Sequence, residues 1–199
     1  MKISEDKEFK EKINKTLKNG GVIAFVTDTV WGVGCLPNNK KGVEKIYELK
    51  KRDTSKPLIL MSDKEENLFP YVKEIPLKTK NIMKKYFPGA LTVILERSDK
   101  TPLFITSNKN TVGIRVPNNK TFQKICSIID GNVLATTSAN ISGQAPALTY
   151  QETVQNLNGL VDIIIEDEEE KATGEPSTVA AITDDGIKIF RQGKVIIRL

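Results

Sequence analysis

Five short polar motifs, spread along the chain, carry the side chains best suited to chemistry. They are residues 27–32 (TDTVWG), 50–58 (KKRDTSKPL), 115–117 (RVP), 137–143 (TSANISG) and 175–178 (EPST). Each follows or borders an apolar run, so we expect each at the end of a strand, where open α/β sheets bind their ligands. The motifs supply many hydroxyls, Lys, Arg and an Asn but few carboxylates, and this combination suits an anionic, phosphate-rich ligand.

Two of the motifs are basic. Lys50, Arg52 and Lys56 are expected at the end of a helix and the entrance to a strand, although cations there also compensate the helix dipole. Arg115 ends a strand in front of Pro117, which would present a rigidly placed guanidinium to a carboxylate or phosphate. A structural ion pair is the alternative role for Arg115.

The hydroxyl-bearing motifs point the same way. Residues 136–142 place four hydroxyl groups and Asn140 directly after an apolar run. A capped turn needs one or two such side chains rather than five, which favours contact with a ligand. Thr27 and Thr29 alternate at a strand end, so both should point to one face. Trp31 is either a core residue or a wall against a base or apolar group.

The composition excludes several classes of site. The 199 residues include no histidine, which excludes Ser-His-Asp and Cys-His catalysis. Cys35 and Cys126 are isolated, so neither zinc nor a disulfide framework is indicated. Neither a P-loop nor a dinucleotide-binding glycine motif is present. The net charge of +5 fits either a general excess of lysine or a local basic surface for nucleotide or RNA.

The apolar patterns predict alternating helices and strands. Helices are expected at about 9–19, 39–50, 77–86, 122–129 and 149–157, and strands at 22–26, 58–61, 91–95, 112–115, 133–136 and 161–165. Three more strands, 178–182, 187–191 and 195–198, should be joined by turns at 184–186 and 192–193. The order predicts an α/β fold, with residues 1–199 as a single domain whose twisted mixed sheet is flanked by helices.

Two further features concern the surface and the location. The acidic run 166–170 is expected to be a solvated loop rather than a metal site, with a mobile flap over the pocket as the alternative. No apolar stretch approaches the roughly 18 residues needed to cross a bilayer, so no membrane contact is expected. Residues 1–12 are charged and lack the apolar centre of a signal peptide, which favours a cytoplasmic location.

As a set, the motifs resemble the YrdC-like family, whose characterised bacterial members are threonylcarbamoyl-AMP synthases. The similarity runs in order from Gly21 to Arg191 and includes K-x-R at residues 50–52 and S-x-N at residues 138–140. The elements T-x-T-x-[YW]-G, P-G-x-L-T, R-x-P, S-A-N-x-S-G and S-T are also present. The resemblance implies a twisted mixed α/β sheet with a basic cavity. Longer relatives carry a C-terminal extension domain, which we do not expect in this chain.

The resemblance implies ATP, L-threonine and bicarbonate as substrates. The products would be L-threonylcarbamoyladenylate, used for threonylcarbamoyladenosine modification of tRNA, and pyrophosphate. Carried over by motif, it assigns catalysis to Lys50, Arg52, Ser138 and Asn140, ATP binding to Arg52, Lys56, Thr111, Ser138 and Arg191, and threonine binding to Thr29, Arg115, Thr136 and Ser177. Mg²⁺ would accompany ATP, and no metal site formed by the protein is expected. Candidate partners are tRNA or double-stranded RNA and downstream tRNA-modification proteins.

Other functions stay open at this point. A sister subfamily, YciO-like, shares the fold and would provide a non-catalytic nucleotide-binding protein; Lys50 and Arg52 favour the synthase instead. A double-stranded RNA or tRNA-binding module would also explain the basic charge. Met61 stands where the family often has histidine, and it is either core or part of the wall that faces the methyl group of threonine.

Overall fold

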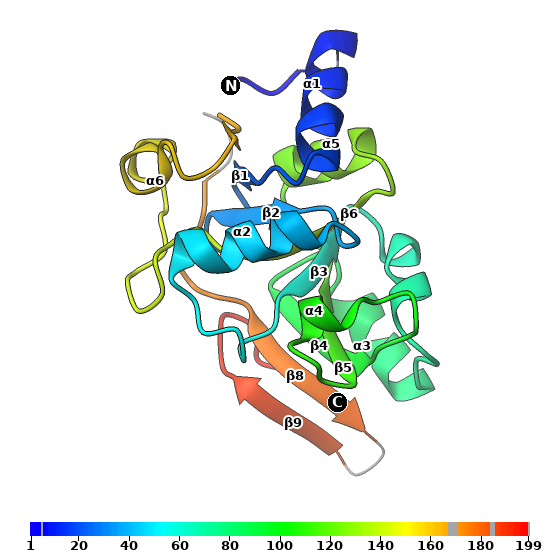
Figure 1. The fold of residues 1–199 in the computed structure, drawn as a ribbon. Helices are drawn as coiled ribbons and strands as arrows, with labels where there is room; N and C mark the ends of the chain where they lie inside the picture. The colour runs from blue at the N-terminus through cyan, green and yellow to red at the C-terminus, as the bar shows by residue number, and fades with distance from the viewer. Residues whose placement is uncertain (5, 167–170, 184–185, 199) are drawn as a thin grey trace.

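The computed structural model describes residues 1–4, 6–166, 171–183 and 186–198. These residues form one nine-stranded sheet with the order β7-β1-β2-β6-β3-β5-β4-β8-β9 (Figure 1). The strands are β1 (Ile23–Phe25), β2 (Gly32–Cys35), β3 (Ile59–Ser62), β4 (Leu91–Glu96), β5 (Thr111–Arg115), β6 (Val133–Ser138), β7 (Ile163–Ile164), β8 (Thr178–Thr183) and β9 (Gly186–Arg191). Pairs β1/β7, β3/β5 and β4/β8 are parallel, and the others are antiparallel, so the predicted mixed sheet is confirmed.

Helices cover both faces of this sheet. They are α1 (Lys7–Lys18), α2 (Lys40–Lys50), α3 (Leu77–Tyr86), α4 (Leu103–Thr106), α5 (Lys120–Ile128) and α6 (Tyr150–Leu157), with 3₁₀ turns at η1 (Glu65–Asn67) and η2 (Phe69–Tyr71). Apolar side chains of α1 and α5 share one core cluster with β1 and β3. Those of α2, α3, α4 and α6 belong to a second cluster, which uses the alternate residues of the same strands. The two clusters fix the sheet between two helical layers.

Side-chain caps explain where several helices begin. Asn39 caps α2 by accepting a hydrogen bond from the Gly42 amide at 3.2 Å. Asn119 and Thr149 play the same part at α5 and α6. Each such cap satisfies an amide that the helix itself leaves unpaired. The predicted start of α2 at Asn39 therefore has a direct physical cause.

The strand β2 is absent from the sequence-based prediction. It consists of Gly32, Val33, Gly34 and Cys35, and glycine has a low strand propensity. The two glycines serve packing, because a Cβ atom on Gly32 would lie 2.9 Å from the ring of Phe25. The fold therefore selects small residues here at the expense of local strand preference.

The predicted strand 195–198 is wrong. Those residues pair with no strand in the described structure, and instead lie against β8 and α3. Thr178 Oγ1 donates to the Val195 carbonyl at 2.6 Å, and the Arg198 amide donates to Tyr86 Oη at 3.1 Å. Side-chain contacts thus replace the ladder that the alternating pattern suggested. Two other predictions, the turn at 184–186 and the acidic run 166–170, lie largely outside the described residues, which omit 184–185 and 167–170.

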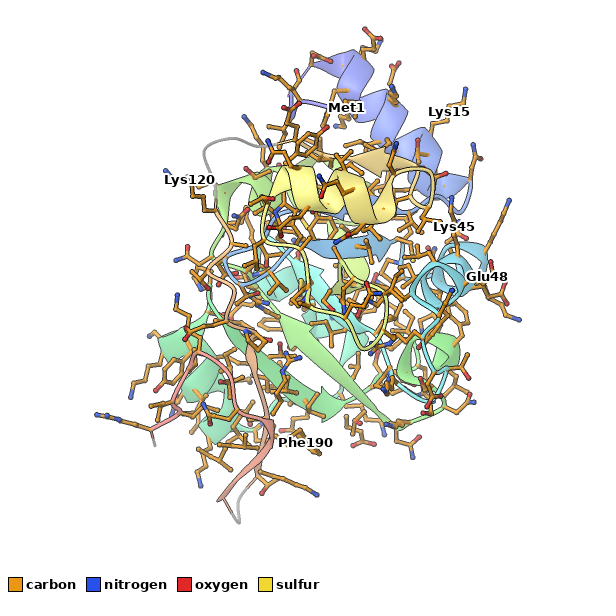
Figure 2. The ribbon with its side chains drawn as sticks, turned by 90° about the vertical axis from the view of Figure 1, so that its left-hand side faces the viewer. Met1, Lys15, Lys45, Glu48, Lys120 and Phe190 are labelled. Carbon is orange, nitrogen blue, oxygen red and sulfur yellow. The ribbon has the colours of Figure 1, made fainter. Side chains whose placement is uncertain are left out.

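The two ends of the molecule differ in character. Lys15 of α1 and Met1 lie at one end of the molecule, whereas Phe190 of β9 lies at the opposite end (Figure 2). β9 is the last strand in the sheet order, and Phe190 is 56% exposed. The predicted site residues lie on α2, β5, β6 and β9, and on the loops that follow β1, α2 and β6 or precede β8.

Candidate active site

The register of the central strands gathers several predicted residues on one face of the sheet. Thr136 in β6 faces Ile59 in β3, and Met61, two residues further along β3, faces Arg115 in β5. Ser138 follows Thr136 by two residues, so its side chain points to the same face. Alternation along the strands thus brings Thr136, Ser138 and Arg115 to one surface.

Lys50 ends α2 and is buried, with 1% of its surface exposed. Its Nζ donates to the Ser138 carbonyl, to the Asn140 carbonyl at 2.6 Å and to Asn140 Oδ1 at 3.0 Å. Three oxygen acceptors match the three N–H groups of an ammonium. Within the described part of the chain, no carboxylate forms an ion pair with it. Burial, and secondarily the charge of Arg52, lower the pKa of Lys50 to about 7.

Asn140 links Lys50 to Ser138. Its Oδ1 accepts hydrogen bonds from Lys50 Nζ and from Ser138 Oγ at 2.6 Å. Its Nδ2 donates to the carbonyls of Ile141 at 3.0 Å and Gln144 at 2.7 Å. These four bonds use both donors of the amide and both lone pairs of its oxygen. The side chain of Asn140 is therefore placed to orient Lys50 and Ser138.

Arg52 is held by the loop that follows α2. Lys51 adopts a left-handed conformation, with φ of 48°, and turns the chain between Lys50 and Arg52. Arg52 Nε donates to the Lys56 carbonyl at 3.2 Å, which also accepts from Tyr47 Oη at 2.9 Å. Burial lowers the pKa of Arg52, and the charges of Tyr47 and Asp53 oppose that shift. The side chain of Lys56 is exposed.

Arg115 is 2% exposed, and its guanidinium contacts the side chains of Asp28 and Thr29. Its Nη1 donates to Thr29 Oγ1 at 2.9 Å, and its Nη2 donates to Asp28 Oδ1 at 2.5 Å. Its Nε donates to the Gly89 carbonyl at 3.0 Å. Burial lowers the pKa of Arg115, while Asp28 opposes that shift. The ion pair that sequence left open as an alternative is therefore present.

Asp28 is the site residue that the sequence prediction missed. Its only signal was its position between two threonines in the first motif, and that position names no partner. Its contact with Arg115 joins residues 87 apart in the chain, so the fold was needed to find it.

Arg191 is hydrogen-bonded to Ser177, another of the predicted site residues. Arg191 Nε donates to the Ser177 carbonyl and its Nη2 to Ser177 Oγ, both at 3.0 Å. Ser177 Oγ also shares a hydrogen bond of 2.9 Å with Thr92 Oγ1. The positive charge of Arg191 adds to the effect of burial in lowering the pKa of Arg115.

The remaining predicted residues lie on the strands β3, β5 and β6. Thr136 is buried, and its Oγ1 donates to the Ile59 carbonyl at 3.3 Å. Thr111 is exposed at the start of β5, four residues before Arg115. Met61 packs in the core cluster of α1 and α5, which favours its interpretation as core.

The other sequence features have structural roles. Trp31 is 1% exposed and its ring lies 6.1 Å from that of Tyr150, so it belongs to the core. Cys35 and Cys126 are buried thiols. Among the described residues, no three side chains of His, Cys, Asp or Glu are grouped as a metal site would require. None of the helices described is long and apolar enough to span a membrane.

Comparison with known proteins adds independent information. The family model Sua5/YciO/YrdC, described as "Telomere recombination", matches residues 15–193. The threonylcarbamoyl-AMP synthase of Vibrio campbellii is 34% identical over 185 residues, which cover 92% of this chain and 98% of that protein. The threonylcarbamoyl-AMP synthase of Pyrococcus abyssi is 32% identical over 177 residues, which cover 89% of this chain and 52% of that protein.

Solved structures agree on the fold. P. abyssi Sua5 complexed with L-threonine matches with a TM-score of 0.88 and 28% identity, over 97% of this chain and 56% of that chain. E. coli YciO matches with a TM-score of 0.82 and 25% identity, over 96% of this chain and 91% of that chain. The chain thus spans just over half of the Sua5 structure and nearly all of YciO. On the extent of the family match and of these similarities, the chain belongs to the Sua5/YciO/YrdC family.

Proposed function

We propose that this chain is a threonylcarbamoyl-AMP synthase, which makes L-threonylcarbamoyladenylate and pyrophosphate from ATP, L-threonine and bicarbonate. Relatives named for this activity align over nearly the whole chain. The observation that carries the proposal is Lys50, a buried amine whose hydrogen-bond partners are all neutral oxygens. A buried cation is costly without a counter-charge, and the triphosphate of ATP would supply one.

The proposed reaction has two steps. The amine of threonine forms a bond to the carbon of bicarbonate, and loss of water gives a carbamate. A carbamate oxygen then attacks the α-phosphorus of ATP, and pyrophosphate leaves. The carbamate is already anionic, so catalysis rests on positioning the reactants and stabilising charge, for which no histidine is needed.

The residues divide between the two substrates in this proposal. Lys50 and Arg52 neutralise the triphosphate, with Ser138 oriented beside them by Asn140. Lys56, Thr111 and Arg191 also contact ATP. Threonine lies against Thr29 and Arg115, with Thr136 and Ser177 nearby. The planar fork of Arg115 suits the carboxylate of threonine.

Mg²⁺ would reach this site with ATP. Phosphate oxygens and water are its preferred ligands in nucleotide sites, and the metal would neutralise the charge of the departing pyrophosphate. Lys50 and Arg52 would share in this charge neutralisation.

The experiment that tests the function is pyrophosphate release with ATP, threonine and bicarbonate each omitted in turn. We expect release only when all three are present. Release that does not depend on threonine would show an ATP-hydrolysing enzyme instead.

A second candidate is a non-catalytic nucleotide-binding protein of the YciO type, favoured by the match to 91% of the E. coli YciO chain. Such a protein would bind ATP and release no pyrophosphate in any combination of substrates.

A cytoplasmic location and contact with tRNA are further parts of the proposed synthase function. Binding to an RNA backbone should weaken steeply as salt is raised, whereas nucleotide binding in a pocket should weaken less.

A further inference from the structure

The pair formed by Asp28 and Arg115 is unequally buried. The side chain of Arg115 is 3% exposed and that of Asp28 is 17% exposed. Of the two charged groups, the carboxylate is thus the one that solvent or a ligand can reach more readily. Asp28 therefore lies on the outer, more accessible side of the pair.

Both partners retain hydrogen-bonding capacity. Asp28 Oδ1 accepts from Arg115, and no other donor to the Asp28 carboxylate is found among the described residues. Arg115 has five N–H groups, of which one on each nitrogen is engaged, so one on Nη1 and one on Nη2 remain. An acceptor and two donors are thus held side by side.

The backbone around Asp28 is fixed. Thr173 Oγ1 donates to the Asp28 carbonyl at 3.1 Å, and the Gly174 amide donates to the Thr29 carbonyl at 2.8 Å. On the other side, Thr27 Oγ1 donates to the Val30 carbonyl at 2.7 Å. A loop held at both sides presents its carboxylate in a defined place, as a binding group requires.

An α-amino acid is a zwitterion whose carboxylate and ammonium are carried by the same carbon. The Asp28–Arg115 pair offers the complementary charges at adjacent positions, and the charge of Arg191 nearby gives the group a net positive charge for the carboxylate. We propose that Asp28 binds the α-ammonium group of the amino-acid substrate while Arg115 binds its carboxylate. The inference rests on the proposed function, because it assigns the amino-acid substrate to this site.

The alternative is that Asp28 only positions Arg115. The two roles are separated by comparing L-threonine with its analogue in which a hydroxyl replaces the ammonium group. Both ligands carry the carboxylate that Arg115 would bind, and only threonine carries the group assigned to Asp28. If Asp28 only positions Arg115, its replacement should therefore weaken the binding of both ligands equally.

The experiment measures the affinity of both ligands by calorimetry, with an ATP analogue that cannot release pyrophosphate. In Asp28→Asn we expect threonine binding to weaken roughly 10- to 100-fold more than binding of the analogue, as for loss of a hydrogen bond to a charged group. Asp130→Asn is the matched control, because it removes a carboxylate that is ion-paired with Lys18 at 2.6 Å. The control should leave the ratio of the two affinities unchanged.

Equal weakening of both ligands in Asp28→Asn would overturn the proposal. Asp28→Glu is the second variant, since it retains the charge beside Arg115 and moves the free oxygen by one methylene. Asp28→Glu should lower the ratio of the affinity for threonine to the affinity for the analogue several-fold. An unchanged ratio would also overturn the proposal. A wild type that binds threonine but releases no pyrophosphate would refute the synthase activity, while the comparison of the two ligands would still decide the role of Asp28.

Discussion

Replacing Lys50 by methionine should change how the stability of the protein depends on pH. The pKa of Lys50 is lowered from 10.5 to about 7 in the folded protein, chiefly by burial. Between these two values the unfolded chain binds a proton at Lys50 that the folded protein does not. The free energy of unfolding of the wild type should therefore rise with pH in this window, and below it Lys50 should add nothing to the pH dependence.

The size of the effect follows from the shift. One pKa unit corresponds to about 1.4 kcal/mol, so the contribution of Lys50 between pH 7 and pH 9 is about 2 kcal/mol. Little solvent screening is expected, because Lys50 is only 1% exposed. Methionine also leaves the three oxygens around Nζ without their donor, which costs stability at every pH. The change with pH, rather than the absolute loss, therefore isolates the charge.

The assay is urea unfolding of the wild type and Lys50→Met at pH 7 and pH 9. The wild type should gain about 2 kcal/mol relative to the variant over this interval. Lys51→Met, at the exposed neighbouring position, controls for the loss of one lysine. A difference between wild type and Lys50→Met that is the same at both pH values would refute the view of Lys50 as a buried, destabilised cation.

Three further predictions concern neighbouring groups. Arg115→Lys should raise the KM for threonine far more than that for ATP, because an ammonium cannot reproduce the fork of the guanidinium; equal effects in steady-state kinetics would argue against this role. Tyr47→Phe removes the hydroxyl donor to the Lys56 carbonyl, and should raise the KM for ATP roughly 2- to 10-fold with the threonine KM unchanged. Lys51→Gly should raise the free energy of unfolding by about 1 kcal/mol, because φ of 48° favours glycine, and a less stable variant in urea would contradict this.

Much of the fold follows from local pattern. The helix expected at 77–86 coincides with α3, and the caps at Asn39 and Thr149 mark the starts of α2 and α6. The strand β2 escaped prediction because its two glycines are selected by packing against Phe25. The segment 195–198 has an alternating pattern but pairs with no strand in the described structure, since contacts with Thr178 and Tyr86 take its place.

The site was predictable in its residue types and less so in its contacts. Lys50 and Asn140 were expected near a common ligand, and the structure brings them into direct contact across 90 residues of chain. The pairing of Arg115 with Asp28 depends on how β5 approaches the loop after β1, which no local pattern specifies. Proximity between distant segments is a property of the sheet order, and only the assembled sheet reveals it.

The most direct test of the account is whether carbon from bicarbonate enters a nucleotide product. The purified protein is incubated with ATP, L-threonine and carbon-13-labelled bicarbonate, and the products are analysed by mass spectrometry. We expect threonylcarbamoyladenylate that carries one labelled carbon, formed only when all three substrates are present and lost in Lys50→Met. Release of pyrophosphate or AMP with no labelled adenylate would contradict the proposed synthase activity.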